Sequence, residues 1–297
     1  MHFLSYFSPM YFFLITGILC SSLIFVAFKL FSKYQINTFN AIVVNYITAL
    51  SLAALISKGA IFSTFMQSDW KWLSALLGLI FIGLFNVMAK SSQEAGVAIT
   101  GVANKMSFIG PIIFGVFVLN ENFSPLQTTG VFLAVVAVLL TSFAKGEKEA
   151  EQKMLLPIVL FFGGAALDTL LSVSQSGIIG NVDTLSFTGS IFGMAAIIGV
   201  LILAFMTLKT KKLPSKKDIL AGVLLGIPNF FSIYFFLHSL DFKELDSSQI
   251  FPAFNLSVIL LNTVIGLIIF KEKLQLFNYI GIVLAVASIL LIVFLNG

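Results

Sequence analysis

Two ionisable side chains interrupt otherwise apolar stretches of this chain. Lys105 and Asp168 each lie inside a run long enough to cross a bilayer. A charge at the centre of a membrane costs at least ~2.5–3.5 kcal/mol, so such residues mark functional sites by default. The ammonium of Lys105 could bind a carboxylate or phosphate, or take part in proton coupling. Asp168 could bind an ammonium, carry a coupling proton, or form a structural ion pair with Lys105.

Asparagines form a second polar set at corresponding depths of different apolar stretches, as the pairs Asn104 with Asn255 and Asn86 with Asn229. An amide both donates and accepts hydrogen bonds, so it can orient a zwitterionic or hydroxylated solute. The alternative is hydrogen bonding between helices, worth ~0.6 kcal/mol on average. For Asn86 and Asn229 the two roles are equally supported, because Pro228 frees backbone carbonyls that need partners.

Further candidates flank these residues. Gln249 lies close to Pro252, and broken helices near the midplane commonly build transport sites. Phe108, Phe251 and Phe254 could stack on an aromatic solute, although packing is the simpler role. The predicted solute-binding residues are therefore Asn86, Asn104, Lys105, Phe108, Asp168, Asn229, Gln249, Phe251 and Asn255.

Motifs for catalysis or metal binding do not occur. The chain has one cysteine (Cys20), two histidines and no glycine-rich phosphate loop. All 17 basic residues are lysines, so bidentate guanidinium clamps are not available. We expect no catalytic residue, no bound metal and no cofactor, and hence a protein that is not an enzyme.

The elements that position these side chains follow from composition. Of the 297 residues, 59% are hydrophobic and only 10% charged, whereas a soluble domain has about 25% charged residues. This excludes a soluble enzyme and a nucleic-acid-binding protein. Ten apolar stretches of about 20 residues can each cross the bilayer. They cover roughly 10–30, 38–57, 71–91, 95–119, 125–143, 154–174, 184–208, 218–238, 246–270 and 275–295.

These stretches lack the alternating pattern of a membrane β-barrel. We therefore predict an all-α integral membrane protein with ten transmembrane helices, the first of them retained rather than cleaved as a signal. A charged linker, 144–153, separates a first five-helix unit (1–143) from a second (154–297).

Lysines lie mostly on one side of this arrangement. The loops on one side contain Lys58, Lys71 and Lys243; the other side, here called the lysine-rich side, contains Lys29, Lys33, Lys90, Lys145, Lys148, Lys153, Lys209, Lys211, Lys212, Lys216, Lys217, Lys271 and Lys273. The positive-inside rule places the lysine-rich side in the cytoplasm and both termini outside. We expect a multi-pass protein of the cytoplasmic (inner) membrane.

The two halves of the sequence repeat. A shift of 151 residues aligns polar and small residues that chance seldom matches: Asn104 with Asn255, Gly115 with Gly266, Glu121 with Glu272, and Gly130 with Gly281. Because each copy has an odd number of helices, the second copy enters the membrane from the opposite side. Such inverted-topology repeats are typical of secondary transporters.

The last part of each copy shares one spacing of residues. It reads Pro111-x9-Glu121-x8-Gly130 in the first copy and Asn262-x9-Glu272-x8-Gly281 in the second. This resembles the EamA-type domain of the drug/metabolite transporter superfamily, present twice. The resemblance implies a central cavity lined by the first, third and fourth helices of each half, with the last helix outside it, often at a dimer contact. It also implies cytoplasmic termini, opposite to the lysine distribution. Asn262 stands where a proline is common, so we expect a less kinked ninth helix.

The sequence therefore predicts a secondary transporter that exports or exchanges a small organic metabolite by alternating access. An amino acid or similar zwitterion fits one buried cation and one buried acid. Drugs, lipophilic compounds or nucleotide-sugar-like metabolites are alternative cargoes, and a non-transporting structural or sensor protein is the alternative of another class. Expected partners are the solute, lipid, a coupling proton and a second copy in a homodimer, but no nucleic acid.

Overall fold

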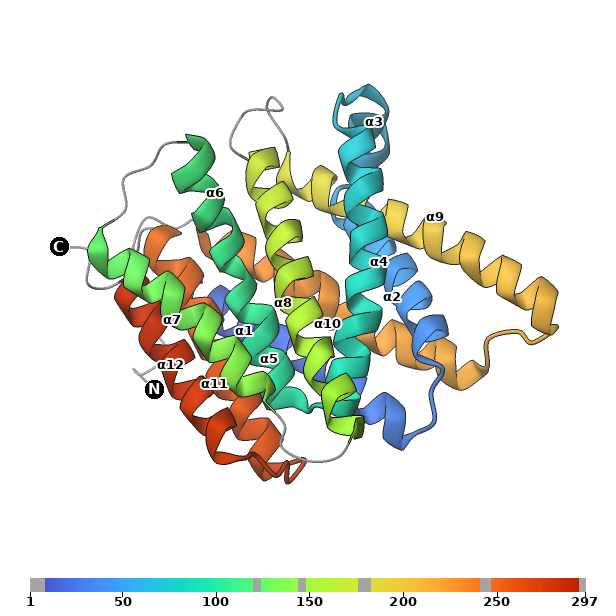
Figure 1. Cartoon of the computed structure of the whole chain (residues 1–297). Coiled ribbons are helices and arrows are strands. Elements are labelled where there is room, and N and C mark those ends of the chain that lie inside the picture. Colours follow the sequence, from blue (N-terminus) through green and yellow to red (C-terminus); the bar gives the residue numbers. More distant parts are fainter. Residues whose placement is uncertain (1–8, 120–123, 144–147, 176–182, 241–246, 294–297) are drawn as a thin grey trace, which may run out of the picture.

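The predicted helical architecture is confirmed in a computed structural model, which describes residues 9–119, 124–143, 148–175, 183–240 and 247–293 (Figure 1). Its helices are α1 (Pro9–Lys33), α2 (Thr38–Ile56), α3 (Ala60–Gln67), α4 (Lys71–Glu94), α5 (Val97–Lys105), the 3₁₀ turn η1 (Met106–Phe108), α6 (Ile109–Leu119), α7 (Pro125–Ser142), α8 (Lys148–Gln175), α9 (Thr184–Thr210), α10 (Lys216–Leu240), α11 (Ser247–Ile268) and α12 (Leu276–Val293).

Each of the ten predicted spans corresponds to helix, with the fourth divided among α5, η1 and α6. Among the described residues, seven helical segments are long and apolar enough to cross a membrane, and three further apolar segments are shorter: Leu155–Leu171, Ala253–Ile268 and Leu276–Ile292. Large apolar side chains cover the outside, with Phe117 80% and Val283 65% exposed, as a lipid environment requires. The short helix α3 was not expected, and α8 begins at Lys148, inside the stretch predicted as a linker.

The fourth span is broken where its sequence contains proline. Pro111 has no N–H to donate, and its ring crowds the carbonyl group four residues earlier, at Ser107. The backbone accordingly tightens into the 3₁₀ turn Met106–Phe108 between α5 and α6. In the second repeat Asn262 replaces this proline, and α11 continues from Ser247 to Ile268 without a break.

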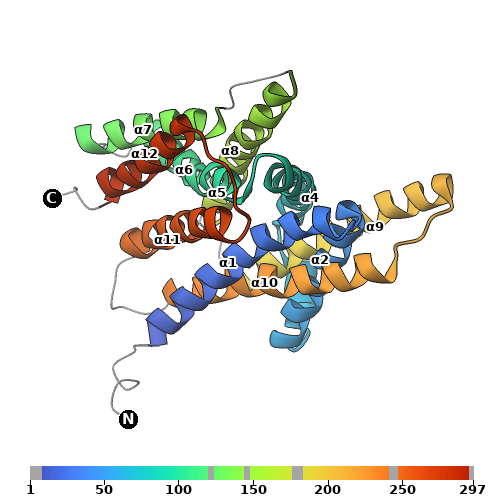
Figure 2. The same ribbon diagram turned by 90° about the horizontal axis from the view of Figure 1, so that it is seen from below.

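The inverted repeat is visible where α7 packs against α12, side by side at one edge of the molecule (Figure 2). A Cβ atom on Gly130 would lie 2.6 Å from Ile292 and 3.1 Å from the carbonyl oxygen of Ser288. A Cβ atom on Gly281 would lie 2.5 Å from the backbone nitrogen of Thr141 and 2.7 Å from the carbonyl oxygen of Ala137. The second set is the first shifted by the repeat, so a pseudo-two-fold axis relates the halves.

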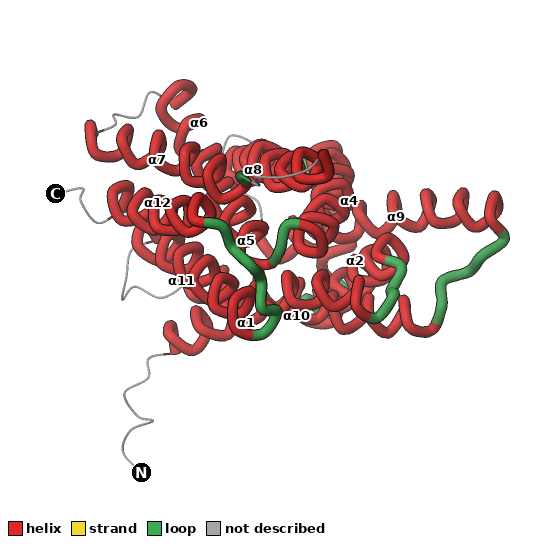
Figure 3. The backbone as a smooth tube through the Cα atoms, turned by 60° about the horizontal axis from the view of Figure 1, so that its bottom comes forward, coloured by secondary structure: helices red, strands yellow, loops and turns green. Residues whose placement is uncertain are grey.

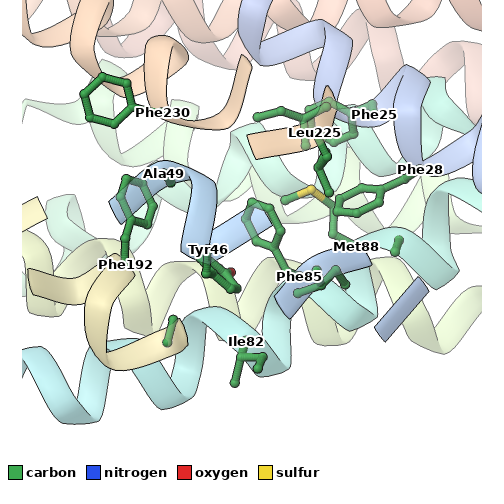
Figure 4. Packing of buried hydrophobic residues seen from close by; sticks show 14 of the residues in the cluster. Phe25, Phe28, Tyr46, Ala49, Ile82, Phe85, Met88, Phe192, Leu225 and Phe230 are labelled. Carbon is green, nitrogen blue, oxygen red and sulfur yellow. The ribbon is translucent and has the colours of Figure 1, made fainter. Parts of the chain in front are cut away.

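Most of the buried apolar side chains form two clusters. The larger joins α1, α2, α4, α9 and α10, where Tyr46 lies against Phe85 and Phe192 with ring centroids 5.4 and 6.1 Å apart (Figure 4). The other joins α5, α7, α11 and α12 and includes Val102 and Met106. Phe254 of α11 belongs to the larger cluster, so the C-terminal end of α5 lies where the two clusters meet.

Candidate solute-binding site

The fourth and ninth spans cross where the repeat-related polar residues lie, with α5 beside α11 (Figure 3). A Cβ atom on Gly266 would lie 3.2 Å from the Cβ atom of Ala98, and one on Gly101 would lie 2.7 Å from the Nδ2 atom of Asn262. Further along α5, Lys105 contacts Phe254. These contacts show that the two helices are antiparallel, which places residues 104 and 105 near 254 and 255.

Lys105 is the last residue of α5 and is partly buried. Its Nζ atom lies 5.1 Å from the centre of the Phe254 ring, a cation–π distance. Within the described residues its ammonium has no hydrogen-bond acceptor, and no carboxylate oxygen lies within 4.0 Å. An ammonium carries three donors. A positive charge with unused donors is therefore held inside the helix bundle.

Asp168 lies on α8, on the other side of α5. The hydroxyl of Ser107 in η1 is 2.5 Å from the Asp168 Oδ2 atom and 2.6 Å from the carbonyl oxygen of Asn104, so its one hydrogen is shared between these two acceptors. Gly164 permits this approach, since a Cβ atom there would lie 2.8 Å from Ser107. The charges of Asp168 and Lys105 attract each other without direct contact. The carboxylate thus balances the ammonium and leaves its donors unused.

The predicted asparagines divide into two kinds. Asn255 is buried and Asn104 partly buried, and neither side-chain amide has a hydrogen bond within the described part of the chain. In contrast, Asn86 donates to the carbonyl oxygen of Ile82 at 2.7 Å, and Asn229 donates to Asn45 Oδ1 at 3.1 Å. The two amides without a hydrogen bond lie where α5 and α11 cross. Asn86 bonds within its own helix α4, whereas Asn229 joins α10 to α2.

The aromatic and glutamine candidates are less informative. Phe108 is 6% exposed and packs into the cluster with Met106. The side chains of Gln249 and Phe251 lie outside the described part of the structure. Phe254 alone among the predicted phenylalanines contacts a predicted charge in the residues described here.

The sequence did not identify Ser107 or Asn45 as partners of the predicted residues, and it identified Asn262 only as a replacement for proline and not as a buried polar group. Asn262 is fully buried, and neither atom of its amide has a hydrogen-bond partner among the residues that the structure describes. An unpaired buried polar group costs about 1–3 kcal/mol. The repeat alignment could have identified Asn262, because an amide stands there in place of a proline.

This arrangement combines a cation, two free amides and an aromatic ring at the centre of a helix bundle. It can bind an anionic group through Lys105 and hydrogen-bond the remainder of a solute through Asn104 and Asn255. No cluster of three or more histidine, cysteine, aspartate or glutamate side chains that could hold a metal ion occurs among the described residues. Fold and site together define a multi-pass helical membrane transporter of small molecules, built from two inverted halves.

The chain belongs to the EamA-like transporter family, whose model matches residues 8–143 and again residues 155–294. It is similar to an uncharacterised protein of Haemophilus influenzae, with 28% identity over 292 residues that cover 95% of this chain and 98% of the relative. A protein of known crystal structure shares its fold, with a TM-score of 0.59 and 16% identity over 96% of each chain. Members of this family are transporters.

Proposed function

We propose that this protein is a secondary transporter that carries a small organic metabolite bearing an anionic group, with an amino acid or similar zwitterion as the preferred cargo. The observation that carries the proposal is the Lys105 ammonium, which lies inside the bundle with unused donors. A buried charge without acceptors is costly. An anionic solute would supply the missing acceptors when it binds.

Each residue of the site has a distinct role in this proposal. Lys105 binds the anionic group, Asn104 and Asn255 orient the solute, and Asp168 balances the charge of Lys105 when the site is empty. For a zwitterion, Asp168 also offers an acceptor to the ammonium group of the solute. Transport proceeds by alternating access of the two halves across the cytoplasmic membrane, as export or exchange, with a proton as the coupling ion and a homodimer as the assembly.

The test is solute binding and counterflow with purified protein. Thermal stabilisation by each of the twenty common amino acids identifies a ligand, since a ligand of the native state stabilises it by mass action. Proteoliposomes loaded with that amino acid then report counterflow of its radiolabelled form. Lys105→Gln should weaken binding about 10- to 100-fold, because a hydrogen bond to a charged group contributes about 1.5–3 kcal/mol.

The matched control is Lys90→Gln, which removes an exposed lysine on the lysine-rich side. This variant should bind and transport like the parent protein. Unchanged counterflow in Lys105→Gln would contradict the site assignment. Counterflow by none of the amino acids would exclude them as the cargo.

A further inference from the structure

Glu272 joins the two halves of the protein on the lysine-rich side. It lies in the turn between α11 and α12 of the second half, and its side chain is only 8% exposed. Its two carboxylate oxygens accept hydrogen bonds from the backbone nitrogens of Val97 and Ala98, at 2.7 and 3.2 Å. These are the first amides of α5 in the first half, whose positive helix end favours an acidic partner. Glu272 therefore caps the helix that ends at Lys105.

The contact extends to α1 and α4. The Lys29 Nζ atom lies 3.5 Å from Glu272 Oε1 and donates to the carbonyl oxygen of Gln93 at 3.2 Å. Gln93 Nε2 in turn donates to the carbonyl oxygen of Phe28 and to Thr38 Oγ1, at 3.1 and 3.2 Å. The ends of α1, α4 and α5 are thus joined to the α11–α12 turn through one carboxylate.

Two glycines make room for this carboxylate. Gly96 has a φ of +108°, and a Cβ atom there would lie 2.7 Å from Glu272. A Cβ atom on Gly266 would lie 2.5 Å from Glu272 Oε2. Side chains at either position would displace Glu272, so the local backbone is built around the carboxylate.

The interface beneath this contact includes an unsatisfied group. Asn262 lies between Glu272 and the Lys105 site and faces Gly101, and its amide has no partner in the described part of the chain. Separation of α5 from α11 would expose this amide to water and so remove the free-energy cost of burying it without hydrogen bonds. The packed state is thus opposed by Asn262 and supported by Glu272, which is the balance that a reversible contact requires.

From these contacts we propose that Glu272, Lys29 and the N-terminal amides of α5 form a latch that closes the lysine-rich side and opens in every transport cycle. Glu272 is a positioning residue that acts on the solute site through α5. The role in the cycle rests on the transport function proposed above, whereas the contact itself can be tested without any solute.

The direct test is the accessibility of a buried thiol. Cys20→Ser provides a background in which Ala98→Cys is the only cysteine; Ala98 is fully buried, and Gly266 leaves room beside it. Protein in lipid nanodiscs is treated with a charged methanethiosulfonate reagent, and mass spectrometry measures the labelling rate. Glu272→Gln should raise this rate about tenfold or more, because it removes the charge that the α5 amides and Lys29 bind.

Two further variants distinguish loss of the latch from a general rise in the accessibility of the Ala98→Cys thiol. Lys29→Met removes the ion pair and the hydrogen bond to Gln93 but leaves the α5 amides capped by Glu272, so the rate should rise by only about twofold to fivefold. Glu94→Gln is the matched control, since Glu94 lies on the same side and, within the described segments, pairs only with the exposed Lys90. It should label at the parental rate. Equal rates for Glu272→Gln and the parent, or an equal rise in Glu94→Gln, would overturn the latch.

A second measurement covers the case in which Glu272→Gln does not fold. In the Cys20→Ser background, which here keeps Glu272, Lys29→Cys can be joined to Lys273→Cys in the α11–α12 turn by a short bifunctional methanethiosulfonate reagent. Counterflow should stop in the cross-linked protein and return after reduction. Counterflow that continues in fully cross-linked protein would show that the contact need not open. Faster labelling of Glu272→Gln without transport of any solute would retain the contact and reject the proposed function.

Discussion

The fourth and ninth spans are copies of one repeat element, yet they differ at the point where they cross. The fourth is broken at Met106–Phe108, whereas α11 is continuous. In the broken copy the Ser107 hydroxyl is hydrogen-bonded to the Asp168 carboxylate, and Lys105 is the last residue of α5. In the unbroken copy the same shift places Leu256 at the position of Lys105, and Asn262 is buried with no partner among the described residues. The break at Met106–Phe108 and the charge of Lys105 therefore both belong to the fourth span, in the first half of the chain.

This difference shows how two inverted copies can be specialised without losing their shared packing. The α7–α12 contacts remain symmetric, because Gly130 and Gly281 meet residues that the same shift relates. The charged groups occur on the first-half helix α5 and on the second-half helix α8, so the site draws on both halves. Alternating access requires the two halves to move relative to each other. In a site formed by both halves, this movement would change the distance between Lys105 and Asp168.

The largest expected effect is the loss of the counter-charge. Asp168→Leu should lower the free energy of unfolding by about 2–3 kcal/mol, because Lys105 is then left alone in the membrane. Unfolding in detergent measures this change, and Asn255→Leu is the comparison in the unbroken span, with an expected cost below about 1 kcal/mol. The double variant Lys105→Met with Asp168→Leu should recover most of the loss. A double variant no more stable than Asp168→Leu would contradict the charge balance.

Ser107→Ala should have the next largest effect. It removes the hydrogen bond to the Asp168 carboxylate, with an expected cost of about 2 kcal/mol in the free energy of unfolding. The control is Ser288→Ala in α12, whose hydroxyl donates to the uncharged carbonyl of Gly130 at 2.8 Å. Its expected cost is about 1 kcal/mol. Equal costs for both variants would show that Ser107 makes only an ordinary helix contact.

Asn262→Leu should have the smallest effect and the opposite sign. Leucine has nearly the shape of asparagine and removes an unsatisfied amide, so the free energy of unfolding should rise by about 1 kcal/mol. Asn229→Leu should instead destabilise the protein, because Asn229 donates to Asn45. A loss of stability in Asn262→Leu would mean that its amide is satisfied in the membrane.

Much of the helical fold was predictable because bilayer thickness imposes a length and a composition on each span. The ninth helix, in which Asn262 replaces a proline, runs unbroken from Ser247 to Ile268. The break at Met106–Phe108 was expected only in general terms, from Pro111, because the residue that loses its helical geometry lies a turn earlier. The helix α3 was missed because a short amphipathic segment between spans lacks a length signal.

The candidate site was predicted in part. Lys105 and Asp168 stood out from the sequence because charges are scarce in apolar spans. Of the roles left open for Asp168, a direct ion pair with Lys105 does not form among the described residues, and its carboxylate accepts a hydrogen bond from Ser107. Asn86 and Asn229 could not be separated from Asn104 and Asn255 by residue type. Asn86 bonds to the Ile82 carbonyl of its own helix, and Asn229 bonds to Asn45 of another helix; the second bond depends on tertiary packing.

By itself, the sequence determined the membrane environment, the ten spans, the inverted repeat and the two buried charges, since each follows from composition or from residue spacing. Tertiary structure alone decided which polar groups are satisfied and which are free. It also decided that Glu272, visible in the sequence only as a repeated acidic residue, caps α5 of the other half. The reason is physical: hydrogen-bond satisfaction depends on distances between helices, which no local pattern of residues specifies.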